Sequence, residues 1–225
     1  MAIRTETLVL TPLSENCTIL WDPDAPGDAA RECVVVDPGG DAPRIASELA
    51  RLGLACRLIL ITHGHSDHAG AAAPLRAATG APIAVHPLDA ERLGSKLLSG
   101  ATWLDLEFEE HTPDLLLTTG TAAIGVPNHP TLVFDVAHTP GHCPGHVTFH
   151  LPAAGILVGG DLVFHGGVGR TDLPGGDPAA LDESIRRHFL TLPDETRVLP
   201  GHGPETTVGR ERRSNAFVTP LAAGG

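Results

Sequence analysis

The chain has 225 residues, of which 42% are hydrophobic and 19% charged, and this balance excludes a largely disordered protein. Its 15 Lys and Arg stand against 27 Asp and Glu, so the formal net charge of −12 disfavours nucleic acid as a partner, because contacts with phosphates need basic side chains. The length fits one domain, residues 1–225, that can bury a sizeable core.

In the first half of the chain, aliphatic and β-branched runs bounded by Gly, Pro and Asp predict strands over residues 7–20, 31–37, 58–62 and 83–86. A helix is expected over residues 41–52, because Ile45, Leu49 and Leu52 share one face and Gly53 then ends it. After the third strand, Ser66 or Asp67 can cap a second helix that runs to about Thr79.

The segment from Pro87 to Leu117 is the hardest to interpret. Residues 88–98 look helical, and the apolar residues between Trp103 and Phe108 then alternate with polar ones. One interpretation is a helix and an edge strand that cover the sheet. The other is a loop that overhangs the active site and offers Trp103 or Phe108 to an apolar part of a substrate.

In the second half, similar short runs predict strands near residues 115–118, 132–136, 146–151, 156–158 and 197–199. A helix is expected near residues 178–190, and no internal sequence repeat is detected.

No run reaches 18 consecutive apolar residues and the N-terminus has no long apolar segment, so we expect neither a membrane span nor a signal peptide. Four cysteines without a Cys-x-x-Cys pair are typical of reduced thiols, and we predict a cytoplasmic protein.

The stretch from Thr62 to His68 carries the strongest functional signal. It places three imidazoles and a carboxylate directly after the apolar run 58–61, where a buried strand presents a loop. Imidazole and carboxylate together suit zinc, iron or manganese. In an extended loop His63 and His65 point the same way and can reach one metal, while Asp67 and His68 can serve a second metal a few ångströms away.

The same pattern recurs three more times, as an apolar run that ends in Gly or Pro and then an imidazole or carboxylate. These later positions add His142, Asp161 and His202 to the candidate ligands. One such match would be weak evidence, but four of them supply seven candidate ligands at strand ends. We therefore predict a site for two divalent metal ions. The ligand set favours zinc, with iron and manganese as the alternatives.

These motifs resemble the metallo-β-lactamase-fold hydrolases, and the stretch Gly169-Arg170-Thr171-Asp172-Leu173-Pro174-Gly175-Gly176 resembles their glyoxalase II-like (hydroxyacylglutathione hydrolase-like) branch. The resemblance runs from about Val9 to about Phe217. It implies an α/β fold, a four-layer αββα sandwich with the metals at one edge. It also implies the ligand groups: His63, His65 and His142 for the first metal, Asp67, His68 and His202 for the second, and Asp161 as the bridge.

A dinuclear site of this kind favours hydrolysis, because two metals can share a hydroxide and polarise a carbonyl at the same time. We assign Asp67 a catalytic role as well, since its free oxygen can orient that hydroxide. Among residues that could orient the ligands, Asp37 is a candidate, although it can equally be a capping residue of the turn that follows. His146 is expected to orient a ligand or to pack. His86, His111, His129, His138, His150, His165 and His188 are expected to lie outside the site.

The predicted substrate is a small acyl thioester such as S-lactoylglutathione. Longer glyoxalase II enzymes carry a C-terminal helical domain that grips glutathione, but this chain ends soon after Phe217 and contains no tyrosine, so glutathione itself is in doubt. Arg170 is predicted to bind a substrate carboxylate, and its alternative is an ion pair with Asp172 or Asp177. We expect a monomer or a homodimer. The rival functions are a mononuclear iron persulfide dioxygenase and a lactone or ester hydrolase.

Overall fold

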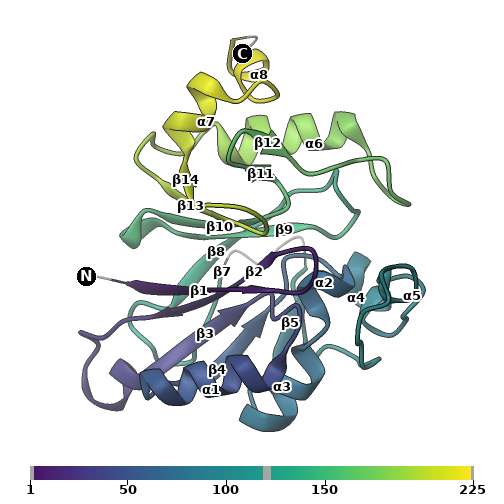
Figure 1. Cartoon of the computed structure of the whole chain (residues 1–225). Helices are drawn as coiled ribbons and strands as arrows, with labels where there is room; N and C mark the ends of the chain where they lie inside the picture. The colour runs from purple at the N-terminus through teal and green to yellow at the C-terminus, as the bar shows by residue number, and fades with distance from the viewer. Residues whose placement is uncertain (1–2, 119–122, 224–225) are drawn as a thin grey trace.

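A computed structural model of the chain describes residues 3–118 and 123–223. Two six-stranded sheets face each other, and helices cover both outer faces (Figure 1). The first sheet contains, from edge to edge, β1 (Arg4–Leu10), β2 (Glu15–Trp21), β3 (Glu32–Val36), β4 (Ala55–Leu60), β5 (Ile83–Val85) and β6 (Leu115–Leu116). The second contains β14 (Thr206–Thr207), β13 (Arg197–Pro200), β10 (Ile156–Gly160), β9 (Val147–Leu151), β8 (Val133–His138) and β7 (Ala123–Gly125).

The helices divide between the two outer layers and the rim. Those that follow strands of the first sheet are α1 (Ala42–Leu52), α2 (Ser66–Ala69), α3 (Ala72–Thr79), α4 (Pro87–Leu93) and α5 (Ala101–Leu104). Those of the second half are α6 (Pro178–Ser184), the π-helical turn η3 (Ile185–Phe189), α7 (Val208–Ser214) and α8 (Thr219–Ala223). Two short 3-10 turns, η1 (Gly27–Arg31) and η2 (Pro152–Ala154), and a small hairpin of β11 (Val163–Phe164) and β12 (Gly167–Val168) complete the elements.

Strand alternation explains why the chain forms layers. In β4, Leu58 and Leu60 pack into the core between the two sheets, whereas Ile59 packs under the helices α1 and α3. In β10, Leu157 points to the opposite outer layer and packs in one cluster with Phe189 of the turn η3. Successive side chains of a strand point to opposite faces, so a strand that is apolar throughout needs a layer on both sides. The αββα sandwich predicted from the sequence is confirmed.

Several predicted elements differ from the observed ones. The strand expected over residues 7–20 is a hairpin of β1 and β2, because Thr11 and Ser14 both adopt positive φ and Ser14 bonds back to Thr11. The helix expected from residue 66 to 79 breaks into α2 and α3, and neither Ser66 nor Asp67 caps it; the N-cap position is His65. The break lies at Gly70, where the chain packs against Gly39 and a Cβ would meet the Gly39 carbonyl oxygen at 2.5 Å.

The segment from Pro87 to Leu117 forms neither of the two predicted arrangements in full. Its helix α4 ends at Leu93, α5 is a single turn, and the residues that alternate near Phe108 form no strand. Phe108 is buried in the core beneath the first sheet, whereas Trp103 is 78% exposed. The strand expected at 115–118 is the short β6, and it extends the first sheet rather than the second. Of the helices that the structure describes, none is long and apolar enough to cross a lipid bilayer.

Candidate metal centre

The seven candidate ligands come from four segments that follow the strands β4, β8, β10 and β13, and two of them, Asp67 and His68, lie on the short helix α2. Three of these strands belong to the second sheet and one to the first, so the loops meet at one edge where the two sheets face each other. The structure brings all seven side chains together. Their assignment as metal ligands stays a prediction.

The first group contains His63, His65 and His142, and one ring nitrogen of each lies within 4.8 Å of the others. His63 is fully buried, and its ring stands edge-on to the rings of His65 and His142, with centroids 4.7 and 4.8 Å away. The Nδ1 atom of His65 is 2.9 Å from Nε2 of His142. Three imidazoles from two distant loops therefore face one common point.

The second group contains Asp67, His68 and His202, again with one candidate atom of each within 4.8 Å. The Nε2 atoms of His68 and His202 are 3.3 Å apart, and Oδ2 of Asp67 lies 3.4 Å from Nε2 of His202. Asp67 and His68 are buried, whereas the side chain of His202 is 26% exposed. This group is therefore the more accessible one on the side of His202.

Asp161 lies between the two groups. Its Oδ1 is 3.4 Å from Nε2 of His68, and its Oδ2 is 3.5 Å from Nε2 of His142 and 3.8 Å from Nε2 of His202. One carboxylate thus faces members of both groups with different oxygens. This is the position that a bridging ligand of two metals requires.

For three of the candidate ligand histidines, a hydrogen bond to Nδ1 determines that Nε2 is the ring nitrogen available to a metal. Nδ1 of His142 donates to the Arg170 carbonyl, Nδ1 of His68 donates to Asp37, and Nδ1 of His202 donates to the Leu13 carbonyl. With Nδ1 protonated, the neutral ring holds its lone pair on Nε2, and that atom points into the cluster in all three cases. Among the described residues, Nε2 of His63 and Oδ1 of Asp161 are buried without a hydrogen-bond partner. Converging lone pairs and unpartnered buried atoms fit a pair of cations.

The two groups differ in their electrostatics. Burial lowers the pKa of His63 and His65 well below the usual value, and neighbouring imidazoles lower it further, so these rings stay neutral and able to ligate. Burial alone would lower the pKa of His68 and raise that of Asp67. The carboxylates around His68 outweigh burial and raise its pKa, and the imidazoles around Asp67 likewise lower the pKa of that carboxyl.

Two residues orient the candidate ligands, and for each of them this is one of the two roles that the sequence left open. Asp37 accepts from Nδ1 of His68 at 3.0 Å and also from the amide and hydroxyl of Thr62, at 2.7 and 2.6 Å. His146 is fully buried, and its Nε2 accepts the backbone N–H of Asp161 at 3.0 Å while its Nδ1 donates to Thr139. Asp37 therefore fixes the ring of His68, and His146 fixes the backbone of Asp161.

The start of β2 holds the loop of His202 in place, a role that the sequence did not predict. The side-chain amide of Asn16 donates to the carbonyls of Pro200 and Gly203, at 2.9 and 2.8 Å, and so brackets His202. The neighbouring Glu15 is fully buried within 4.8 Å of Asp37 and His68, and burial raises the pKa of its carboxyl. No motif around Glu15 and Asn16 indicates this role in the sequence.

We expect Asn16→Ala to weaken metal binding in the second group by about tenfold, because outer residues that orient ligands have effects of about 10- to 100-fold. The affinity is measured by competition with a chelator of known strength. Ser47→Ala is the control, since it also removes a side-chain donor to a backbone carbonyl but lies on α1, away from the ligands. Unchanged affinity in Asn16→Ala would show that the loop of His202 keeps its position without this clamp.

Arg170 contributes to the site through its backbone, whose carbonyl accepts from His142. Its guanidinium forms a bidentate ion pair with Asp172 at 2.6 and 2.7 Å, which is the alternative that the sequence left open, and its side chain is 62% exposed. A role of the Arg170 side chain in substrate binding stays a prediction.

Cys143 is fully buried, and its thiol donates to Asp89 at 3.2 Å.

The other histidines lie outside the two ligand groups, as predicted, although several are buried rather than on the surface. His129 bonds to the Ala29 carbonyl and the Leu132 amide, and His86 stacks on His138 with ring centroids 4.2 Å apart.

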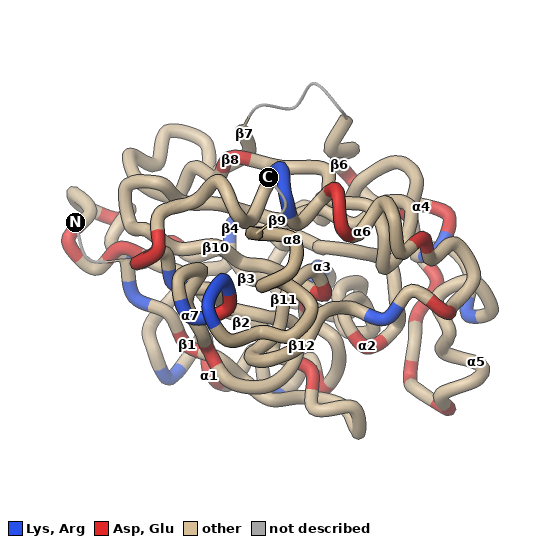
Figure 2. The backbone as a smooth tube through the Cα atoms, turned by 90° about the horizontal axis from the view of Figure 1, so that it is seen from above, with Lys and Arg blue, Asp and Glu red and all other residues tan. Residues whose placement is uncertain are grey.

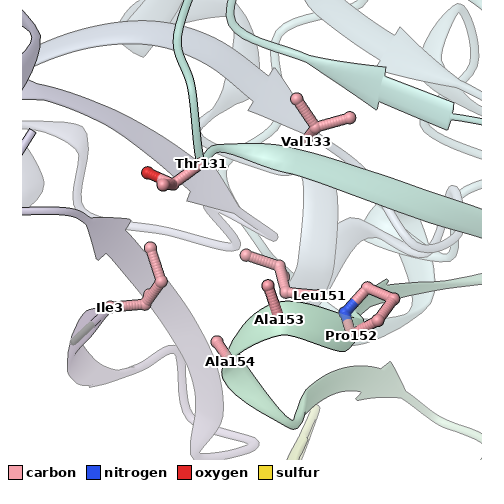
Figure 3. A pocket seen from close by; sticks show the side chains of 7 residues that line it. All are labelled: Ile3, Thr131, Val133, Leu151, Pro152, Ala153 and Ala154. Carbon is pink, nitrogen blue, oxygen red and sulfur yellow. The ribbon is translucent and has the colours of Figure 1, made fainter. Parts of the chain in front are cut away.

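A small cavity of about 40 Å³ lies apart from the candidate ligands, between Ile3, Thr131 and the η2 turn (Figure 3). Its lining is mostly apolar and includes none of the candidate ligands.

Basic and acidic residues intermingle along the backbone, as Figure 2 shows. The helix α7 carries a local group of arginines, but Arg212 and Arg213 both pair with Asp194. We therefore keep the prediction that nucleic acid is not a partner.

Comparison with known proteins places the chain among metal-dependent enzymes. The profile of the Metallo-beta-lactamase superfamily matches residues 10–202. The chain is 34% identical to hydroxyacylglutathione hydrolase GloC of Haemophilus influenzae, over 95% of this chain and 97% of that protein. Its fold is similar to the crystal structure of the BLEG-1 B3 metallo-beta-lactamase, with a TM-score of 0.88 and 36% identity over 96% of this chain and 100% of that chain. For TTHA1623 in a di-iron-bound form, the TM-score is 0.80 and the identity 39%, over 94% of this chain and 99% of that chain.

Proposed function

The chain belongs to the metallo-beta-lactamase superfamily, and we propose that it is a dinuclear hydrolase of small acyl thioesters such as S-lactoylglutathione. The observation that carries the proposal is Asp161, whose two oxygens face His142 on one side and His68 on the other. The similarity to GloC supports a thioester as the substrate. We propose zinc as the metal, and the di-iron form of TTHA1623 makes iron the first alternative to test.

The ligand sets follow the two groups, with His63, His65 and His142 for one ion, Asp67, His68 and His202 for the other, and Asp161 for both. Two divalent ions held there supply a Lewis acid for the thioester carbonyl and an activated water. Asp67 directs one oxygen to His202, and its second oxygen can accept a hydrogen bond from the attacking water and orient it. No serine or cysteine nucleophile is needed, which agrees with the burial of Cys143.

The exposed guanidinium of Arg170 is the proposed contact for an acidic thiol carrier. An exposed ion pair contributes up to about 1 kcal/mol, which corresponds to about a fivefold change in KM. We expect Arg170→Ala to raise KM for S-lactoylglutathione by about this factor and to leave KM for an uncharged acyl thioester unchanged. Binding that is equal in the ground and transition states affects KM rather than kcat.

The kinetics of both substrates are compared for wild type, Arg170→Ala and Arg51→Ala. Arg51 is the matched control, because its side chain is also 62% exposed and also pairs with a carboxylate, Glu48, on the far face of α1. Equal losses on both substrates in Arg170→Ala would make the residue structural. If metal-loaded wild type cleaves neither thioester, the thioesterase assignment is wrong.

Two arms of the same assay address other members of the superfamily. Hydrolysis of a β-lactam is measured because the fold is similar to that of the BLEG-1 B3 metallo-beta-lactamase. Oxygen uptake with a glutathione persulfide is measured because a mononuclear iron dioxygenase uses a subset of the same ligands. Oxygen uptake without thioester hydrolysis would replace the hydrolase by the dioxygenase.

A further inference from the structure

Asp89, on the helix α4, is a fully buried carboxylate whose hydrogen-bond partners, among the described residues, include no candidate ligand side chain. It nevertheless accepts hydrogen bonds from two ligand loops. Its Oδ2 accepts from the backbone N–H of Gly64 at 2.7 Å and from the thiol of Cys143 at 3.2 Å, and its Oδ1 accepts from the backbone N–H of Gly145 at 2.8 Å. A buried carboxylate with three donors is a strong and directional restraint.

These donors flank the first ligand group. Gly64 stands between His63 and His65, and Cys143 directly follows His142. His65 and His142 are 77 residues apart in the sequence, yet their ring nitrogens approach to 2.9 Å. Asp89 is thus the one side chain among the described residues that hydrogen-bonds to both of these loops at once.

The glycines allow the loops to come this close. A Cβ at Gly145 would lie 2.5 Å from Oδ1 of Asp89, and a Cβ at Gly64 would lie 2.6 Å from Cβ of Arg92, one turn further along α4. Arg92 also places its guanidinium 3.7 Å from Oδ1 of Asp89, and it donates to the carbonyls of Leu98 and Pro174. The buried negative charge is therefore compensated, and the helix is tied to the rim of the site.

We infer that Asp89 is a positioning residue that sets the spacing of His63, His65 and His142, and so tunes the affinity of the first metal. The inference rests on the proposed dinuclear centre. If the carboxylate is lost, the two loops keep their glycines and their ligands but lose the common acceptor that aligns them. The second group, which Asp37 and Asn16 hold, keeps its own restraints.

The test is a chelator competition titration of wild type and Asp89→Asn with Zn²⁺, together with the visible absorption spectrum of the Co²⁺-substituted proteins. The side chain of Asn has the same shape as that of Asp but only one oxygen. Its NH₂ group would therefore face either the N–H of Gly145 or the donors of Gly64 and Cys143. We expect the affinity of one site to fall by about 10- to 100-fold and that of the other to change little, with an altered Co²⁺ spectrum. Asp114→Asn is the matched control, because Asp114 also accepts a backbone N–H, that of Ile83, far from the ligands.

A lower melting temperature with two wild-type affinities would overturn the inference, since Asp89 would then be only structural. If Asp89→Asn does not fold, Cys143→Ala and Cys143→Ser decide, because alanine removes one donor to Asp89 and serine keeps it. The inference predicts weaker binding at one site for alanine and recovery for serine, and equal affinities in the two variants would contradict it. If wild type itself binds fewer than two metals, the proposed centre fails rather than the role of Asp89.

Discussion

Replacement of Asp161 by alanine should remove metal from both sites together and lower kcat/KM for the thioester by about a thousandfold or more. The reason is that Asp161 faces both ligand groups, with Oδ1 3.4 Å from His68 and Oδ2 3.5 Å from His142. A catalytic metal contributes several kcal/mol to the transition state, and about 4 kcal/mol corresponds to a thousandfold in rate. Metal content and kinetics are measured on the same preparation.

His202→Ala is the comparison for this experiment. His202 belongs to the second group only and is partly exposed, so its loss should weaken one site and leave the other close to wild type. Asp161→Asn adds a variant of the same shape that lacks the negative charge. Equal and mild losses in Asp161→Ala and His202→Ala, with unchanged metal content, would contradict the bridging role of Asp161.

Phe149→Ala should lower the free energy of unfolding by about 3–5 kcal/mol, the range for removal of a buried phenylalanine. Phe149 on β9 is fully buried in the core between the two sheets, and its ring stands edge-on to that of Phe134 on β8, with centroids 6.3 Å apart. The measurement is denaturant unfolding with the metal concentration fixed, because bound metal also stabilises the folded state.

Phe217→Ala is the control for this substitution. Phe217 is 59% exposed, so its removal should change the free energy of unfolding by less than about 0.5 kcal/mol. A loss below about 1 kcal/mol in Phe149→Ala would mean that the contact between the sheets is not the main core of the fold.

The sequence was most informative where local pattern and fold agree. Leu58 and Leu60 alternate with Ile59 because β4 is covered on both faces, and His63 follows directly at the end of that strand. The helix over residues 42–52 was predictable because Ile45, Leu49 and Leu52 share one face and Gly53 ends it, and the structure adds that Asp41 caps its start. These signals come from neighbouring residues, so one sequence is sufficient to find them.

The remaining features depend on contacts between distant segments. The helix expected after Ser66 is interrupted after Gly70, where Gly39 from another loop packs closely against the chain. Asp89 looked like an ordinary polar residue of a short helix, and its three donors come from positions 25 to 56 residues away. Asn16 reaches a loop 184 residues further on, so its clamp on His202 left no local pattern.

The number of metal ions that each chain binds tests the dinuclear centre most directly. Purified protein is incubated with excess Zn²⁺, freed of unbound metal, and its metal content is determined by elemental analysis against protein concentration. Seven converging ligands, with Asp161 between the two groups, predict close to two ions per chain. A content of one iron per chain that does not rise when metal is added would contradict the dinuclear hydrolase.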